Sequence, residues 1–264
     1  MQTAVAVENA INHQRHLEYA RLSQDLDAAR AIQQSLLPQT MPKILGYSLA
    51  ARSSACYQVG GDYLDIVLEP DGSHLMVVAD VAGKGLASAL VCTAFRSAFR
   101  ALARQSLTLK ELASRLATTL GRGLRGSAAL CHRDLSSAGR RKRRARVRQR
   151  RSGPRYPLWV RASGTPLGLL PGARYTTERV ALPPGSRLLL HTDGLTELFQ
   201  AEEEFGADRL AEAFAYTSPA PAEATLFSLW ATLESFTGHA AQQDDMTAIA
   251  LCRLSDTAQQ EAHP

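Results

Sequence analysis

The chain has few aromatic residues and no long apolar run. Of its 264 residues, 45% are hydrophobic and only 6% are aromatic, a composition typical of soluble globular proteins. Its longest apolar stretches, such as Leu75–Val78 and Leu188–Leu190, are far shorter than the about 20 residues that a membrane-spanning helix needs. Residues 1–19 are too polar for the apolar core of a signal peptide. We therefore expect a cytoplasmic protein with no membrane span.

Cysteine is scarce and scattered. The four cysteines, at positions 56, 92, 131 and 252, show no CxxC spacing. A structural zinc site or a disulfide framework would need closer or more regular spacing. We therefore expect free thiols.

Positive charge is concentrated in one segment. Arg140–Arg155 carries ten basic residues in sixteen, and no acid occurs from Leu135 to Thr177. Without that segment, 20 basic residues remain against 25 acidic ones, although the whole chain has a net charge of +5. The basic character is therefore a local property and not one of the whole surface.

The N-terminal region has the pattern of an amphipathic helix. In residues 13–37, apolar side chains recur at spacings of three and four, and Pro38 ends the pattern. The apolar positions are Leu22, Leu26, Ala29, Ile32 and Leu36. Such a helix either packs on its own domain or forms a short coiled-coil stalk that makes a homodimer or links the domain to a sensor. We assign residues 1–42 to this helical linker, 43–254 to the main domain and 255–264 to a tail.

From Tyr47 the period changes to that of strands. Alternating stretches over 47–69 and 73–80 are joined by a turn at Pro70–Gly72. Helical patterns follow over 84–105 and 108–123, a hairpin is expected over 173–194, and two helices and a last strand complete the domain. This order predicts an α+β fold in layers.

Acidic residues stand at the ends of the predicted strands. Asp62 follows Gly60-Gly61, Asp80 begins the sequence DVAGKG, Asp193 lies in TDG, and Asp244-Asp245 precede the last strand. Converging carboxylates repel one another beside apolar strands unless a cation neutralises them. Oxygen ligands without His or Cys favour Mg²⁺ or Mn²⁺ over zinc.

Five ordered motifs resemble those of PPM-type metal-dependent serine/threonine phosphatases, and most of all their bacterial sporulation-stage-II-E branch. The motifs are GGDYLD, VADVAGKGLASAL, SGTPLGLLPG, LLLHTDGLTE and DDMTAIAL. The upstream AARAIQQSLLP also resembles the helix that enters this domain, so the likeness runs from about Ala29 to Leu254. It implies a β-sandwich flanked by helix pairs, preceded by an N-terminal helix, with a two-metal site at one end.

The resemblance also implies roles for individual residues. Asp62, Asp80, Asp193 and Asp244, with the carbonyl of Val81, are the expected ligands of two Mg²⁺ or Mn²⁺ ions; Asp245 is the alternative to Asp244. The implied reaction is hydrolysis of phosphoserine by metal-activated water. The implied partner is a phosphoserine regulatory protein of the anti-anti-sigma-factor type. We expect Lys84 to have a structural role, with the alternative that it offers charge to a phosphate, and His191 to be a packed core residue and not a ligand.

The segment 125–156 departs from the family pattern. Relatives of this kind carry two core strands there, with a sequence like Tyr-Val-Asn-Ala-Gly-His, whereas this chain has an arginine-rich stretch with few strand formers. Val147–Arg151 can be encoded by GTA CGT CAA CGC CGG, which reads Tyr-Val-Asn-Ala-Gly in another frame. A compensated frameshift from about Leu124–Leu130 to Pro157 is therefore our hypothesis, with an irregular loop as its expected structure.

Two other functions remain open at this point. The basic segment would attract nucleic acid or acidic lipid, but it lacks interleaved aromatic residues and a recognised module. A chain that lacks two core strands would also suit a catalytically impaired regulator that only binds its partners.

Overall fold

Two antiparallel sheets packed face to face form the centre of the computed structural model, which describes residues 2–123, 130–138, 166–170, 172–177, 179–217, 220–238 and 240–255. The first sheet has the order β1–β8–β5, with bounds Tyr47–Ser54, Met246–Arg253 and Arg187–His191. The second has the order β2–β3–β4, with bounds Tyr63–Leu68, His74–Val81 and Leu130–Ala138.

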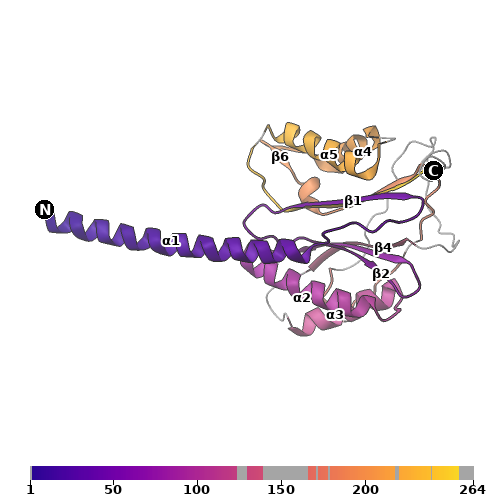
Figure 1. Cartoon of the computed structure of the whole chain (residues 1–264), viewed down its shortest axis with the longest axis horizontal. Helices are drawn as coiled ribbons and strands as arrows, with labels where there is room; N and C mark the ends of the chain where they lie inside the picture. The colour runs from indigo at the N-terminus through magenta and orange to yellow at the C-terminus, as the bar shows by residue number, and fades with distance from the viewer. Residues whose placement is uncertain are drawn as a thin grey trace.

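Helix pairs cover the two outer faces of this sandwich (Figure 1). The pair on the second sheet is α2 (Leu86–Ala103) and α3 (Leu109–Gly123), and the pair on the first is α4 (Gly206–Tyr216) and α5 (Ala222–Thr237). A short 3₁₀ helix η1 (Asp193–Leu195) follows β5, and a small hairpin pairs β6 (Phe199–Gln200) with β7 (Glu203–Glu204). The predicted α+β sandwich flanked by helix pairs is confirmed.

Alternation along the strands divides the core into three apolar layers. In β3, Leu75 and Val77 pack toward α2 and α3, whereas Met76 and Val78 pack between the two sheets. In β8, Ile249 likewise lies between the sheets while its neighbours pack toward α4 and α5. Strands that are buried on both faces read as nearly continuous apolar runs, and the sequence of β3 has this character.

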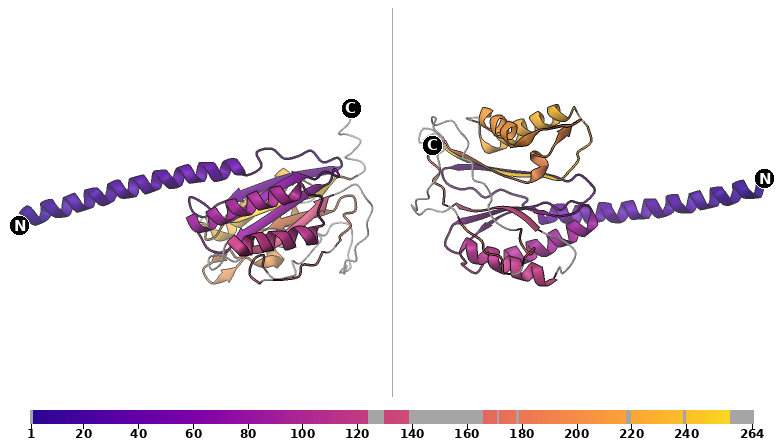
Figure 2. Two further views of the ribbon diagram at one scale, coloured as in Figure 1. Left: turned by 90° about the horizontal axis from the view of Figure 1, so that it is seen from below. Right: turned by 180° about the vertical axis from the view of Figure 1, so that it is seen from behind.

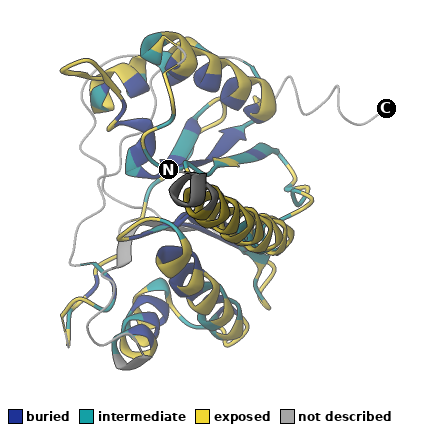
Figure 3. Ribbon diagram, turned by 90° about the vertical axis from the view of Figure 1, so that its left-hand side faces the viewer, coloured by how far each residue is buried: buried dark blue, intermediate teal, exposed yellow. Residues whose placement is uncertain are grey.

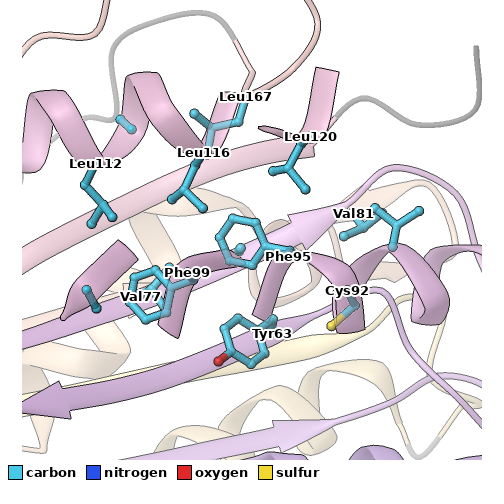
Figure 4. Close-up of a cluster of buried hydrophobic side chains, with 14 of the residues drawn as sticks. Tyr63, Val77, Val81, Cys92, Phe95, Phe99, Leu112, Leu116, Leu120 and Leu167 are labelled. Carbon is cyan, nitrogen blue, oxygen red and sulfur yellow. The ribbon is translucent and has the colours of Figure 1, made fainter. Parts of the chain in front are cut away.

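The layer between the second sheet and its helices is centred on three aromatic rings (Figure 4). Tyr63 of β2 meets Phe95 and Phe99 of α2 edge to face, with ring centroids 5.6 and 6.4 Å apart. By length and composition α2 is the one described helix that could cross a membrane. One face of α2 is buried in this layer, and a core helix of this kind has the same length and apolar composition as a membrane-spanning one.

The N-terminal helix α1 spans Gln2–Leu36 and projects from the domain (Figures 1 and 2). It begins eleven residues before the predicted residue 13. Only its last part meets the domain: Leu26, Ala29 and Leu36 of the predicted face are half-buried, whereas Leu22 and Ile32 are 55% and 63% exposed. A view along the helix shows how much of its surface is exposed (Figure 3).

Two expectations about strands were wrong. The irregular loop was expected to begin near Leu130, but β4 runs from Leu130 to Ala138 and pairs antiparallel with β3. Because β3 is buried, an unpaired edge would leave its backbone amides and carbonyls without hydrogen-bond partners and out of contact with water. Any segment can satisfy this need with its own backbone, whatever its side chains are. The described residues of 173–182 form no strand, so the expected hairpin has only its second arm, β5. The arginine-rich run lies outside the described residues.

One acid of β2, Asp65, is part of the core and not of the predicted metal site. Asp65 in β2 is fully buried and receives hydrogen bonds from Arg100 Nε at 2.6 Å and Nη2 at 2.9 Å. The Tyr63 hydroxyl donates to the same carboxylate at 2.5 Å, and the Ile66 amide donates at 2.9 Å. Burial, and then the charge of Asp65, raise the pKa of Tyr63. This bidentate pair fastens α2 to the second sheet.

We expect Arg100→Leu to lower the free energy of unfolding by about 3 kcal/mol or more, because it leaves the buried Asp65 carboxylate without its counter-charge. Asp65→Asn should cost less, since the Arg100 side chain is 41% exposed and can turn to water. Urea unfolding of both variants, with the exposed Arg104→Leu as control, measures the difference. Equal stability of Arg100→Leu and Arg104→Leu would contradict this role of the pair.

Candidate metal centre

The predicted site residues lie where strands of both sheets begin or end. Asp62 directly precedes β2, and Asp80 is the second-last residue of β3. Because Tyr63 pairs with Ala79, continuing the β2–β3 register by one residue brings these two acids together. On the other sheet, Asp193 opens η1 after β5, and Asp244-Asp245 precede β8. The Thr192 amide donates to the Thr247 carbonyl at 3.0 Å, which extends the β5–β8 ladder to this end.

Asp62 is the most buried of these acids. Its side chain Oδ2 accepts a hydrogen bond from Thr192 Oγ1 at 2.8 Å, while Oδ1 is buried without a hydrogen-bond partner among the described residues. Burial, and then the negative charges of Asp80 and Asp245, raise the pKa of Asp62 well above its usual 3.8, and the hydroxyls of Thr247 and Thr192 lower it. A buried carboxylate oxygen without a donor indicates a place for a cation.

Two threonines that the sequence interpretation missed orient this carboxylate. Thr192 Oγ1 donates to Asp62 and accepts from the Thr247 amide at 3.1 Å, and Thr247 Oγ1 hydrogen-bonds Ser53 Oγ at 2.8 Å. Both threonines are buried; Thr192 directly precedes Asp193, and Thr247 lies two residues after Asp245. A threonine at the end of an apolar strand, next to a motif acid, is the sequence signal that could have identified them.

The two acids before β8 have different surroundings. Asp245 accepts backbone hydrogen bonds on both oxygens, from the Cys56 amide at 2.7 Å and the Gly61 amide at 2.6 Å. Asp244 pairs with Lys84 at 3.2 Å, and Lys84 Nζ also donates to the Gln243 carbonyl at 2.7 Å. The hydrogen bond to Asp244 is the main cause that raises the pKa of Lys84. Asp245 therefore holds the Gly61 loop, and the Asp244 carboxylate lies at the surface of the site.

Glycine is required where backbone segments meet. A Cβ atom on Gly61 would lie 2.8 Å from the Val81 carbonyl oxygen, and a Cβ on Gly194 would lie 1.9 Å from the carbonyl oxygen of Asp245. Both contacts are with main-chain atoms, which cannot turn aside. The Val81 carbonyl thus lies directly against the loop that carries Asp62.

The described residues fit a hard divalent cation. The orphaned Asp62 oxygen, the neighbouring Asp80 and the Val81 carbonyl beside Gly61 offer oxygen atoms of the kind that Mg²⁺ and Mn²⁺ prefer. Within the described part of the chain, no three His, Cys, Asp or Glu side chains stand close enough to enclose an ion. Asp80 and Asp245 lie near Asp62, but these side chains do not form a closed cage.

His191 is half-buried at the end of β5, where its Nδ1 lies 2.9 Å from the Thr192 carbonyl oxygen. This contact with its own strand fits the expected structural role. The thiols of Cys56, Cys92 and Cys252 are free, as expected.

Comparison with known proteins identifies relatives. The family model of stage II sporulation protein E (SpoIIE) matches residues 70–254. Protein IcfG of Synechocystis sp. is 24% identical over 269 residues, covering 87% of this chain and 41% of IcfG. The chain thus spans less than half the length of this curated relative.

Solved structures share the fold. The SiaA-PP2C domain of Pseudomonas aeruginosa superposes with a TM-score of 0.66 at 20% identity, covering 88% of this chain and 96% of that domain. The RsbU and RsbW domains of Rv1364c from Mycobacterium tuberculosis give 0.60 at 21% identity, covering 81% and 63%. The PP2C phosphatase domain of SpoIIE from Bacillus subtilis, with a fragment of its regulatory domain, gives 0.57 at 17% identity, covering 78% and 62%. The sandwich described above is therefore the PP2C fold.

The buried Asp62 carboxyl predicts how pH affects the metal-free protein. Because its pKa is raised in the folded state, the native chain holds a proton that the unfolded chain has lost, so stability should fall as pH rises above 3.8 toward the raised pKa. Thermal melting in EDTA at a series of pH values measures this slope. Asp62→Asn should remove it, and added Mn²⁺ should stabilise the wild type more than the variant.

The exposed Asp25→Asn on α1 is the control for this experiment. If Asp62→Asn and Asp25→Asn melt with the same dependence on pH and Mn²⁺, Asp62 is not the buried acid that responds to the cation.

Proposed function

The chain belongs to the stage II sporulation protein E family, and from this premise we propose that it is a metal-dependent protein serine/threonine phosphatase. We propose that it removes phosphate from a phosphoserine of a cytoplasmic regulatory protein of the anti-anti-sigma-factor type. The observation that carries the proposal is the buried Asp62 oxygen without a hydrogen-bond donor, which has Asp80 and Asp245 as charged neighbours.

We propose that Asp62, Asp80, Asp193 and Asp244, with the Val81 carbonyl, hold two Mg²⁺ or Mn²⁺ ions. When bound, such ions supply positive charge that activates a water molecule and neutralises the charge developing on the phosphate. Asp244 is favoured over Asp245, because both oxygens of Asp245 already accept backbone hydrogen bonds. Within the described residues, the carboxylate of the half-exposed Asp244 has Lys84 and the Asp245 amide as its only polar partners.

The protein residues around the ions prepare the site before a substrate arrives. Thr192 donates to the Asp62 carboxylate and is itself held by the Thr247 amide, and Asp245 holds the Gly61 backbone next to it. Such preorganisation lowers the cost of ordering the site during the reaction. Lys84, on the exposed loop before α2, lies where it can exchange its contact with Asp244 for one with a phosphate oxygen.

The catalytic proposal is tested by removing one ligand charge at a time. Asp80→Asn and Asp193→Asn should each lower Mn²⁺-dependent hydrolysis of a phosphoserine peptide by about 100-fold or more, because ligand loss damages both positioning and charge neutralisation. Calorimetric titration should show weakened Mn²⁺ binding, while circular dichroism shows an intact fold.

The exposed Asp208→Asn in the first turn of α4 is a matched control that should keep wild-type activity. Unchanged Mn²⁺ affinity in both ligand variants would refute the assignment of the ligands. A folded wild type that binds Mn²⁺ but hydrolyses no phosphoserine peptide would favour the alternative of a catalytically impaired regulator.

We also propose that α1 makes a homodimer. Its N-terminal part exposes apolar side chains that a single chain leaves in water, among them Val7, Ile11, Leu17 and Leu22, between 46% and 59% exposed. Pairing of two such helices would bury these side chains. Leu26, Ala29 and Leu36 are half-buried where the same helix meets its own domain, so the two contacts use different parts of the helix.

Removing residues 2–24 should convert a dimer to a monomer, because it removes the exposed part of α1 and keeps the part that meets the domain. Multi-angle light scattering measures the mass. Ile11→Glu with Leu22→Glu should act like the deletion, and Gln14→Glu serves as the control on the same helix. The same number of chains per particle in the full chain and in both altered forms would contradict dimerisation through α1.

A further inference from the structure

One polar side chain of α1 reaches the loop that carries Asp62. Gln33 Nε2 donates to the Gly60 carbonyl at 2.6 Å, and the Gly60 amide donates to Gln33 Oε1 at 3.0 Å. The side-chain amide thus pairs with both polar groups of one residue, in the way that a neighbouring strand would. These two bonds join parts of the chain that are 27 residues apart in sequence.

The position of Gln33 on the helix shows that this contact is part of the packing of α1. The half-buried positions near the end of the helix are Leu26, Ala29, Gln33 and Leu36, at spacings of three and four. The apolar Ile32 next to it is 63% exposed. The helix therefore turns a glutamine toward the domain and a large apolar side chain toward water, which favours a specific hydrogen-bonding role for the glutamine.

The loop that Gln33 holds has no side chains with which to fix itself. A Cβ on Gly60 would lie 2.6 Å from Asp245 Oδ2, and one on Gly61 would meet the Val81 carbonyl. Glycine pairs of this kind are conformationally free until something external restrains them. Asp245 accepts from the Gly61 amide, and the Val81 amide donates to the Gly61 carbonyl at 3.3 Å. Gln33 provides the matching restraint on Gly60.

The C-terminal end of α1 is itself fixed beside the site. Arg96 of α2 donates from Nε to the Leu36 carbonyl at 3.0 Å. The Cys92 thiol of α2 donates to the Asp62 backbone carbonyl at 3.5 Å. The last turn of α1, the glycine loop and α2 therefore form one connected unit around Asp62.

We propose that Gln33 is a positioning residue of the metal centre, which holds the Gly60–Gly61 backbone so that the Asp62 carboxylate faces the cation. This inference rests on the proposed function for its link to catalysis, but the hydrogen bonds to Gly60 can be tested without it. Loss of a group that orients a metal ligand commonly weakens metal affinity or activity about 10- to 100-fold.

The test compares Gln33→Ala and Gln33→Glu with Gln34→Ala, a change of the neighbouring exposed glutamine. Gln33→Glu keeps the size of the side chain but replaces the donor to the Gly60 carbonyl with an acceptor. Both Gln33 variants should raise the Mn²⁺ concentration for half-maximal activity about 10- to 100-fold, with Gln34→Ala unchanged. Saturating Mn²⁺ should restore most of kcat, since Gln33 touches neither substrate nor ion. Because a bound cation also stabilises the folded chain, circular dichroism in EDTA must show that both Gln33 variants are folded without Mn²⁺.

Hydrogen exchange of the Gly60 amide in the metal-free protein gives a second measurement that does not depend on activity. Its exchange should be at least about fivefold faster in Gln33→Ala than in Gln34→Ala, because one hydrogen bond is lost. Equal exchange in the two variants overturns the proposal, whether or not the protein is an enzyme. Faster exchange with unchanged Mn²⁺ dependence in an active protein also overturns it. A wild type without Mn²⁺ binding or hydrolysis counts against the proposed function instead.

Discussion

The burial of a carboxylate at one end of the sandwich is the constraint on which the site depends. Asp62 precedes β2 of the second sheet, yet its hydrogen-bond donor Thr192 follows β5 of the first. Removing a charged group from water is costly unless donors or a cation replace the lost hydration. The two sheets must therefore pack so that the Thr192 hydroxyl reaches the Asp62 carboxylate. A change in how the sheets pack would also change the geometry of the site.

Asp62 and Asp65 are three residues apart but have different roles. Asp65 is buried with a guanidinium, a phenol and a backbone amide around it, and its charge is neutralised within the protein. Asp62 is nearly as buried, but it has acids as charged neighbours and one oxygen without a donor. A fully satisfied carboxylate stabilises the fold, whereas an unsatisfied one among like charges marks a place where a cation can bind.

Much of this arrangement could be predicted from the sequence, because period and motif both report on local structure. The helices after Asp80, the last strand and the acids at strand ends follow from residue patterns that act within a few positions. Strand β4 could not be predicted, since its place is set by the unpaired edge of β3 and not by its own residues. Ile32 was expected on the buried face for a related reason: periodicity recognises apolar residues, and the domain in fact receives Gln33.

The glycine loop before Asp62 explains why contacts that are distant in sequence matter here. Gly60 and Gly61 are needed because larger residues would strike Asp245 and the Val81 carbonyl. The same lack of side chains leaves the loop to be held by groups from α1, from the end of β3 and from the segment before β8. A 35-residue helix is about 50 Å long, and the end of α1 that is fixed to the loop is opposite the end that projects from the domain. Gln33 therefore ties the Gly60 backbone to the end of α1 that packs on the domain, and the projecting part of the helix lies beyond the contacts of Leu26 and Ala29.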